Sequence, residues 1–288
     1  MFAKAKNSFA ILYKNAMINF FIQTRESIKN MDFLKKTVIV TGANRGTGRV
    51  IAENFIAHGA EVFIHSLNEG DSQSTVKEMG FGVPLWGDIS CDSGSEQVLS
   101  QFQKKAQKLS ILVNNLGSGS PGKWSDTSTD DWIKSYNKNT LSAVRMVNSF
   151  LPIIPSGGRI INIGTVGSTR PGKAMPHYYA SKAALANLTS SLAKEVGELG
   201  ITVNLVSPSL IRTEEVEAYF MRIATQNGWG STFEEAEKTI VSNYAPNPMG
   251  RMATRLEVAN VVLFLASSLA SFINGQNIKV DGGGLDLI

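Results

Sequence analysis

The sequence predicts an α/β fold in which a parallel sheet is covered by helices on both faces. Two observations carry this prediction. Short apolar runs rich in β-branched residues alternate along the chain with helical patterns of ten or more residues. The apolar runs are continuous, as in strands that are buried on both sides of a parallel sheet. Right-handed βαβ units are the usual way to connect such strands.

Seven strands are expected in order along the chain. They cover Thr37–Thr41, Glu61–Ser66, Val83–Trp86, Ile111–Asn114, Arg159–Gly164, Ile201–Val206 and Asn277–Val280. Helical periodicity between them predicts helices such as Gly48–His58, Ser95–Lys108, Trp132–Leu151 and Tyr178–Leu199. Two long segments interrupt this alternation, a glycine-rich loop over residues 116–130 and an insertion over residues 207–255. Both follow the carboxyl ends of strands, where open α/β sheets bind ligands.

Composition and charge exclude several classes of protein. Of 288 residues, 43% are apolar and 18% are charged, as in soluble globular proteins. The single cysteine, Cys91, excludes internal disulfides, and the three histidines lie far apart in the sequence, so we expect no metal site. The net charge of +4 belongs entirely to residues 1–30, which leaves a neutral body without the electrostatic footprint of a nucleic-acid-binding protein.

Residues 1–30 differ from the rest of the chain. Apolar residues recur there at helical spacing, from Phe9 to Phe21, but no apolar run is long enough to span a membrane. Three interpretations compete: an amphipathic membrane anchor, an organellar targeting peptide, or sequence upstream of the usual start, because Met31 resembles a native N-terminus. We favour the third. We expect an N-terminal extension over residues 1–30 and one domain over residues 31–288.

A glycine-rich turn connects the first strand to the first helix, with the sequence Thr41-Gly42-Ala43-Asn44-Arg45-Gly46-Thr47-Gly48. Glycines let the backbone turn sharply and approach a ligand closely, and the N–H groups and dipole of the following helix attract negative charge. The strand–turn–helix context makes a pyrophosphate the expected ligand. The residues expected to bind it are Gly42, Asn44, Arg45, Gly46, Thr47 and Gly48.

Further motifs occur in the order and at the spacing of one enzyme family. After the glycine-rich turn come Asn114-Asn115-Leu116-Gly117, Tyr178-Tyr179-Ala180-Ser181-Lys182 and Val280-Asp281-Gly282-Gly283. Over about residues 35–288 the chain therefore resembles the short-chain dehydrogenase/reductase family, most closely its 3-oxoacyl-carrier-protein reductase and glucose dehydrogenase group. The resemblance implies a three-layer, doubly wound Rossmann-type fold with a seven-stranded parallel sheet, a nicotinamide cofactor, and a carbonyl or alcohol substrate.

The spacing of Tyr178 and Lys182 suits proton transfer. Positions i and i+4 share one face of a helix, so the Lys182 ammonium can lie near the Tyr178 phenol. A nearby cation favours the phenolate, so we expect the pKa of Tyr178 to lie below its usual value of about 10. Tyr178 is thus expected to act as general acid in reduction and as general base in oxidation. Tyr179 is the rival phenol, but it lies three residues from Lys182.

The resemblance assigns two further catalytic positions. The family has a serine thirteen residues before its tyrosine that binds the substrate oxygen. This chain has Thr165 there, which keeps the hydroxyl but adds a methyl group, and Ser168 is the alternative. Asn139 matches the family asparagine that kinks its helix and relays protons through water, with Asn137 as the alternative.

The remaining predicted contacts concern the cofactor. By resemblance, Asp88 and Ile89 contact the adenine ring, Asn115 lies under the adenosine, and Ile211 adds a contact beyond the sixth strand. Enzymes that use NAD place an acidic residue at the end of the second strand. This chain has His65-Ser66-Leu67-Asn68 there, while Arg45 is available for a 2′-phosphate and Ser66 adds a hydroxyl. We therefore expect NADP(H) rather than NAD(H).

Together these residues predict a cytoplasmic NADP(H)-dependent oxidoreductase that moves a hydride between the nicotinamide and a carbonyl or secondary alcohol. The alternatives are a 3-oxoacyl-carrier-protein reductase and a cofactor-binding sensor or scaffold with weak catalysis, the latter suggested by Thr165 and by Ser209 in place of a family glycine. The expected partners are a small-molecule substrate and further copies of the chain, in a tetramer or dimer. Nucleic acid is not expected, and membrane contact through residues 1–30 is not favoured.

Overall fold

The computed structural model describes residues 31–285 and has the α/β fold that the sequence predicts. Seven parallel strands form one sheet in the order β3-β2-β1-β4-β5-β6-β9. The strand bounds are β1 Thr37–Val40, β2 Glu61–Ser66, β3 Val83–Trp86, β4 Ile111–Asn114, β5 Arg159–Ile163, β6 Thr202–Pro208 and β9 Asn277–Val280. Because the winding reverses between β1 and β4, their carboxyl ends border the crevice where such sheets bind ligands. The extension predicted over residues 1–30 lies outside the described residues.

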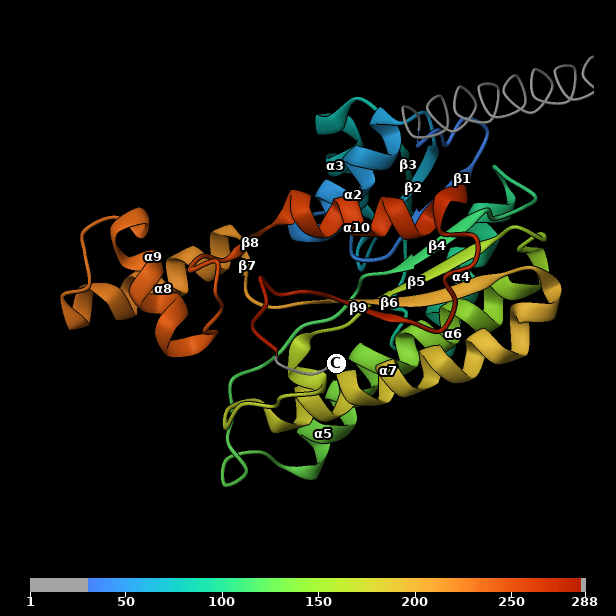
Figure 1. The fold of residues 1–288 in the computed structure, drawn as a ribbon. Coiled ribbons are helices and arrows are strands. Elements are labelled where there is room, and N and C mark those ends of the chain that lie inside the picture. The colour runs from blue at the N-terminus through green and yellow to red at the C-terminus, as the bar shows by residue number, and fades with distance from the viewer. Residues whose placement is uncertain (1–30, 286–288) are drawn as a thin grey trace, which may run out of the picture.

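Helices cover both faces of the sheet (Figure 1). One layer contains α2 (Gly46–Ala57), α3 (Glu69–Met79) and α10 (Arg255–Ala266), and the other contains α4 (Asp92–Gln103), α5 (Thr129–Tyr136), α6 (Ser142–Phe150) and α7 (Pro176–Val196). Successive side chains of a strand point to opposite faces. In β1, Val38 and Val40 accordingly pack with Phe55 of α2, whereas Ile39 packs with Phe102 of α4. Among residues 31–285, no helix is both long and apolar enough to cross a membrane.

Several helix boundaries differ from the prediction. The segment Trp132–Leu151 is not one helix, because a five-residue π-helix over Asn137–Leu141 separates α5 from α6. α5 also begins earlier, at Thr129, where Ser128 and Asp131 form a capping box. The helix predicted over Ser95–Lys108 runs from Asp92 to Gln103. α3 and α10 were not among the helices named from the sequence.

The insertion predicted over residues 207–255 has its own helices. They are α8 (Glu214–Asn227) and α9 (Phe233–Tyr244), which lie between two short parallel strands, β7 (Ile211–Arg212) and β8 (Ala253–Thr254). The insertion has an apolar core of its own, which includes Phe220, Phe233 and Ile240. In Figure 1, α8 and α9 project beyond the edge of the sheet at which β6 ends.

Candidate active site

The glycine-rich turn leads into α2, and its geometry fits a phosphate group. Gly42 and Gly46 have φ of +61° and +59°, a backbone conformation that favours glycine. At Gly48, a Cβ atom would lie 2.5 Å from the Gly42 carbonyl oxygen and would overlap the amide of Asn115, so only glycine allows this approach. α2 has neither a side-chain cap nor an acidic residue in its first turn, which leaves its first N–H groups for an anion.

Asn115 holds the turn against the neighbouring strand. Its Nδ2 donates to the carbonyl oxygens of Thr41 (2.8 Å) and Gly42 (3.1 Å). In return, the Thr41 hydroxyl accepts the N–H groups of Asn115 (3.0 Å) and Leu116 (2.9 Å). These bonds join the ends of β1 and β4, so Asn115 has a structural role in the turn.

His65 also supports the turn, although the sequence did not single it out for this role. It lies in β2 and is 1% exposed. The Gly42 N–H donates to its Nδ1 (3.2 Å), and its Nε2 lies 3.0 Å from the Gly87 carbonyl oxygen. Since Nδ1 accepts, Nε2 carries the proton and donates to Gly87. The ring therefore connects the glycine-rich turn to the loop after β3.

The environment of His65 keeps its ring neutral. Burial lowers the pKa of His65 to about 4, although the hydrogen bond to Gly87 and the charge of Asp88 act in the opposite direction. The sign of this role in the sequence is a histidine that directly follows the apolar run Val62–Ile64 of the strand.

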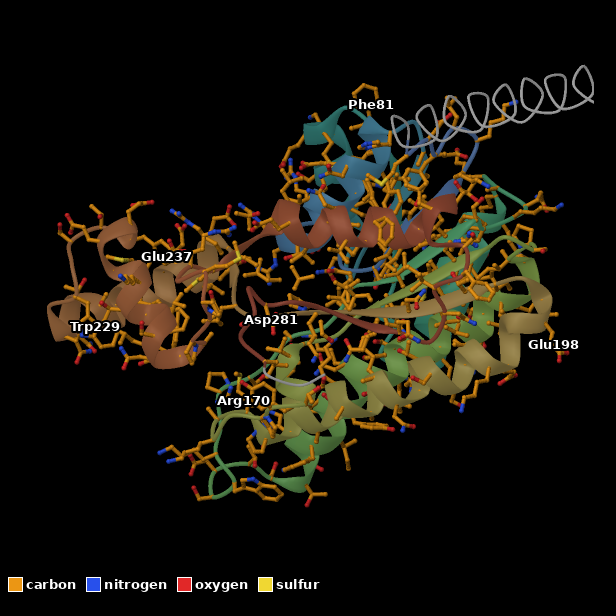
Figure 2. The ribbon with its side chains drawn as sticks, in the orientation of Figure 1. Phe81, Arg170, Glu198, Trp229, Glu237 and Asp281 are labelled. Carbon is orange, nitrogen blue, oxygen red and sulfur yellow. The ribbon has the colours of Figure 1, made fainter. Side chains whose placement is uncertain are left out.

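A cleft of about 640 Å³ opens at the carboxyl ends of the central strands and beneath the insertion. Six of the predicted site residues line it: Thr47, Asn115, Thr165, Tyr178, Lys182 and Ile211. Apolar side chains such as Val166, Met175 and Val216 form much of the remaining wall. Figure 2 labels two charged residues of the lining, Arg170 and Asp281. The structure thus brings together residues from five separate segments of the sequence.

Tyr178 lies in this cleft with Thr165. Burial, with a smaller contribution from Tyr179, raises the pKa of Tyr178 to about 12, and only the nearby Thr165 hydroxyl acts to lower it. The prediction that the pKa of Tyr178 lies below 10 is therefore wrong for this structure. Tyr179, the rival phenol, packs its ring directly against Gly167.

Lys182 explains why the pKa of Tyr178 is not lowered. Its Nζ donates a hydrogen bond of 2.7 Å to the carbonyl oxygen of Ile163, the last residue of β5. Its ammonium is thus directed at the sheet, and it is not among the groups that shift the pKa of Tyr178. Burial lowers the pKa of Lys182 itself to about 8. Tyr178 and Lys182 do lie one turn apart on α7, as predicted, but the Lys182 ammonium binds the Ile163 carbonyl oxygen.

Asn139 lies in the π-helix and faces the loop after β4. Its Oδ1 accepts the Ser118 N–H (2.9 Å), and its Nδ2 donates to the carbonyl oxygens of Ser118 (3.2 Å) and Ser135 (3.0 Å). A Cβ atom at Gly117 would lie 2.8 Å from both Asn139 Oδ1 and Lys182 Nζ. Asn139 and Lys182 are therefore close neighbours on the inner side of this loop.

The two alternative residues have other partners. Asn137 accepts a hydrogen bond of 3.3 Å from Arg145 of α6. The Ser168 hydroxyl donates to the Thr165 carbonyl oxygen at 2.7 Å, which anchors the loop after β5. Both side chains are thus occupied in holding local structure.

Two residues predicted for the adenosine half of the cofactor offer no surface to a ligand. Ser66 is 1% exposed, and its hydroxyl donates to the Asn68 carbonyl oxygen (2.6 Å). Ile89 is likewise 1% exposed and belongs to the core beneath α4. The contacts predicted for Ser66 with a phosphate and for Ile89 with adenine stay predictions, to which these buried side chains lend no support.

Asp88 and Arg45 are exposed at the same end of the sheet. The Asp88 carboxylate accepts hydrogen bonds from the hydroxyl and the N–H of Ser90 (2.6 and 2.9 Å), and these bonds lower the pKa of Asp88. Arg45 projects from the glycine-rich turn and lies 3.4 Å from Glu215 of α8. After the end of β2, Leu67 is exposed, and the first carboxylate that follows is that of Glu69, where α3 begins.

Within the described range, 31–285, no three His, Cys, Asp or Glu side chains are grouped so that they could hold a metal ion.

Comparisons with known proteins show which proteins the chain resembles. A family model described as enoyl-(acyl carrier protein) reductase matches residues 42–284. The chain is 32% identical to the oxidoreductase YvaG of Bacillus subtilis over 253 residues, 86% of this chain and 95% of that protein. It is 32% identical to the 3-oxoacyl-(acyl-carrier-protein) reductase of Escherichia coli over 256 residues, 88% of this chain and 98% of that protein. It also resembles the crystal structure of L-sorbose reductase from Gluconobacter frateurii complexed with NADPH and L-sorbose. The TM-score is 0.82 at 26% identity, over 90% of this chain and 100% of that one.

The fold and the cleft define an oxidoreductase that acts on carbonyl or alcohol groups with a nicotinamide cofactor. The chain belongs to the short-chain dehydrogenase/reductase family.

Proposed function

We propose that this enzyme uses NADP(H) to transfer a hydride between the nicotinamide ring and a carbonyl or secondary alcohol, with Tyr178 as general acid and base. The observation that carries the proposal is the grouping of three side chains in one cleft. Tyr178 and Thr165 both line this cleft, and Lys182 lies one helical turn from Tyr178 on α7. The nicotinamide would supply the hydride when bound, and the protein supplies the proton.

Tyr178 and Thr165 would both contact the substrate oxygen. In reduction, the carbonyl carbon receives the hydride while the oxygen takes the phenolic proton of Tyr178. A pKa of about 12 keeps the phenol protonated near neutral pH, so the proton that reduction needs is present on Tyr178. Oxidation is the reverse and needs the phenolate. The Thr165 hydroxyl would hold the substrate oxygen in line with the phenol.

Lys182 and Asn139 would serve the cofactor side of the reaction. We assign Lys182 to the nicotinamide ribose and Asn139 to a water-mediated path that returns a proton to Tyr178. Their proximity beside Gly117 supports this assignment, since a relay needs polar groups within one or two hydrogen bonds of each other.

Charge at the end of β2 supports NADP(H). A 2′-phosphate is nearly doubly charged, and an arginine is its best partner. Arg45 lies in the glycine-rich turn, and no acidic side chain stands at Ser66 or Leu67 to repel a phosphate. Asp88, Asn115 and Ile211 would complete the cofactor site. The related L-sorbose reductase was crystallised with NADPH.

A second function, reduction of a 3-oxoacyl group on a carrier protein, is favoured by the relatives that carry this name. An acidic carrier protein would need basic residues near the mouth of the cleft. Because residues 31–288 have no net charge, we rank this function second.

We also propose that residues 31–288 form one catalytic domain, that the enzyme is cytoplasmic, and that it forms a homo-oligomer. Exposed apolar side chains support the last point. Phe264, Leu269 and Phe272, at and after the end of α10, are 38%, 42% and 103% exposed. On α7, a run of small residues begins at Ala183, and another helix could pack closely on it.

The test is a screen of the purified enzyme against carbonyl and alcohol substrates, in which each substrate is assayed with NADPH and with NADH. The substrates include 3-oxoacyl groups both as free esters and bound to a carrier protein. The proposal expects turnover that prefers NADPH and is lost in Tyr178→Phe. Turnover only with carrier-bound substrates would instead establish the second function.

A further inference from the structure

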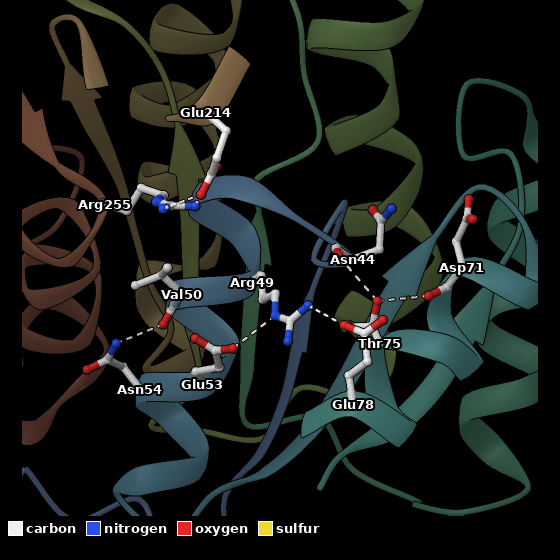
Figure 3. A network of polar contacts seen from close by, with 10 residues as sticks. All are labelled: Asn44, Arg49, Val50, Glu53, Asn54, Asp71, Thr75, Glu78, Glu214 and Arg255. Atoms are coloured by element: carbon white, nitrogen blue, oxygen red, sulfur yellow. Dashed lines mark hydrogen bonds and ion pairs between the residues drawn. The ribbon is translucent and has the colours of Figure 1, made fainter. Parts of the chain in front are cut away.

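The first turn of α8 carries three carboxylates, and each is paired with a different arginine. The pairs are Glu214 with Arg255, Glu215 with Arg45, and Glu217 with Arg212. The neighbouring residues Thr213 and Val216 line the cleft, so this turn is part of the cleft wall. Figure 3 shows the pair of Glu214 with Arg255 close to the start of α2.

Two of the three ion pairs, those of Arg255 and Arg212, are held by more than one contact. Arg255 makes two hydrogen bonds to Glu214, of 2.9 and 2.7 Å. Arg212 is bound by Glu217 and also by Glu234 (2.7 Å), and it lies 4.5 Å from the centre of the Phe233 ring. Because an arginine that makes two or more charge-assisted hydrogen bonds is bound strongly, Arg255 and Arg212 are expected to stay with their carboxylates.

The pair of Glu215 with Arg45 is different. It has a single contact of 3.4 Å, and the two side chains are 59% and 77% exposed. Exposed pairs of this kind are worth little, so Arg45 can exchange Glu215 for a stronger partner at small cost.

Arg45 is also the cation best placed to make such an exchange. The other arginine at this end of α2, Arg49, already binds Glu53 (2.9 Å) and Glu78 of α3 (2.8 Å), as Figure 3 shows. These two carboxylates neutralise Arg49, whereas Arg45 has one loosely held carboxylate.

We propose that Glu215 is a specificity-determining residue, which competes with the 2′-phosphate of NADP(H) for Arg45. The inference rests on the proposed use of NADP(H). A carboxylate within 3.4 Å of Arg45 must either leave or repel a phosphate that binds the same guanidinium. Glu215 therefore weakens binding of NADP(H) and leaves binding of NAD(H) unchanged. It thus reduces the preference for NADP(H) over NAD(H) that Arg45 creates.

The test measures binding rather than turnover. Adenosine 2′,5′-bisphosphate and adenosine 5′-monophosphate, which differ by the 2′-phosphate alone, are titrated into the full-length protein by calorimetry. Glu215→Gln should tighten the bisphosphate about two- to fivefold and leave the monophosphate unchanged. The gain should shrink in 0.5 M salt, because exposed charges are screened.

Glu214→Gln is the matched control, since it removes the adjacent charge but faces Arg255. It should leave the ratio of the two affinities at the wild-type value. An unchanged ratio in Glu215→Gln, or an equal change in Glu214→Gln, would overturn the inference.

Arg45→Ala separates this inference from the proposed function. If Arg45→Ala weakens the bisphosphate about tenfold or more while Glu215→Gln changes nothing, only the role of Glu215 is wrong. If Arg45→Ala leaves the ratio unchanged, Arg45 does not bind the 2′-phosphate, and the proposed basis of NADP(H) preference fails with it.

Discussion

The Asn139 amide and the Lys182 ammonium converge on the backbone of Gly117. A Cβ atom at Gly117 would lie 2.8 Å from Asn139 Oδ1 and 2.8 Å from Lys182 Nζ. Lys182 is anchored by the Ile163 carbonyl oxygen, and Asn139 by the backbone of Ser118 and Ser135. Neither side chain can move aside without breaking a hydrogen bond, so a Cβ atom at this position is disfavoured.

Replacing Gly117 with alanine should therefore displace both polar groups. We expect Gly117→Ala to lower kcat about 10–100-fold, since a displacement of about 1 Å in such a site is costly. Steady-state kinetics and thermal unfolding check the result together. Gly70→Ala is the matched control, because a Cβ there would meet nothing within 4 Å. Wild-type kcat in Gly117→Ala would show that the two side chains need not hold these positions.

Tyr178→Phe should lower kcat about 10²–10⁴-fold and leave the affinity for NADPH nearly unchanged, because only proton transfer is lost. Tyr179→Phe is the control, since that ring packs on Gly167. Steady-state kinetics and fluorescence titration of NADPH separate the two effects. If Tyr179→Phe loses the activity and Tyr178→Phe keeps it, the two tyrosines have been assigned in the wrong order.

The two reaction directions should respond differently to pH. With a pKa of about 12, Tyr178 remains a phenol between pH 6 and 7, where Lys182, with a pKa of about 8, largely keeps its proton. Reduction uses the phenol, so its kcat should change by less than about twofold in this range. Oxidation uses the phenolate, whose fraction rises about tenfold per pH unit. Initial rates in both directions test this, and a flat profile for oxidation would contradict it.

Thr165→Ser should keep most of the activity, and Thr165→Val should lose it about 10²-fold, since valine has the same shape without a hydroxyl. The hydroxyl also accepts the Gly167 N–H at 3.2 Å, so Thr165→Val needs a check of folding by circular dichroism. Equal rates in all three forms would move the substrate-binding role to another residue.

Local patterns in the sequence predicted the fold and much of the site. The glycine-rich turn and the spacing of Tyr178 and Lys182 are short-range signals, and Thr47 of the turn lines one cleft together with Tyr178 and Lys182. The order of strands and helices followed from the alternation of apolar runs and helical patterns. The π-helix at Asn137–Leu141 was not predicted as such, because a single widened turn of five residues is too short to be recognised from apolar periodicity.

Effects that depend on burial or on distant partners could not be predicted. The spacing of Lys182 suggested a lowered pKa for Tyr178, but the ammonium binds the Ile163 carbonyl oxygen nineteen residues away, and burial raises the pKa of the phenol. Ser66 and Ile89 stand at the expected places along the chain, yet both are buried. In the sequence, His65 is one polar residue in a strand, and its partners lie 23 and 22 residues away.

His65 should make the stability of the protein depend on pH. In the folded state burial lowers its pKa from 6.5 to about 4, so the unfolded chain binds a proton in this range that the folded protein does not. Above pH 6.5 the ring is neutral in both states, and its contribution to stability is fully present. As the pH falls from 6.5 to 4, that contribution is lost, up to about 3 kcal/mol of the free energy of unfolding.

Urea unfolding at several pH values between 7.5 and 4.5 measures this loss, and His65→Gln isolates the part that comes from His65. A glutamine can still accept the Gly42 N–H and donate to the Gly87 carbonyl oxygen, but it does not titrate. Wild type should therefore lose more stability than His65→Gln as the pH falls, with the difference growing below pH 6.5. His58→Gln, in which a half-buried histidine at the end of α2 is replaced, should behave like wild type. Parallel curves for wild type and His65→Gln would mean that the ring is not held neutral between the glycine-rich turn and the loop after β3.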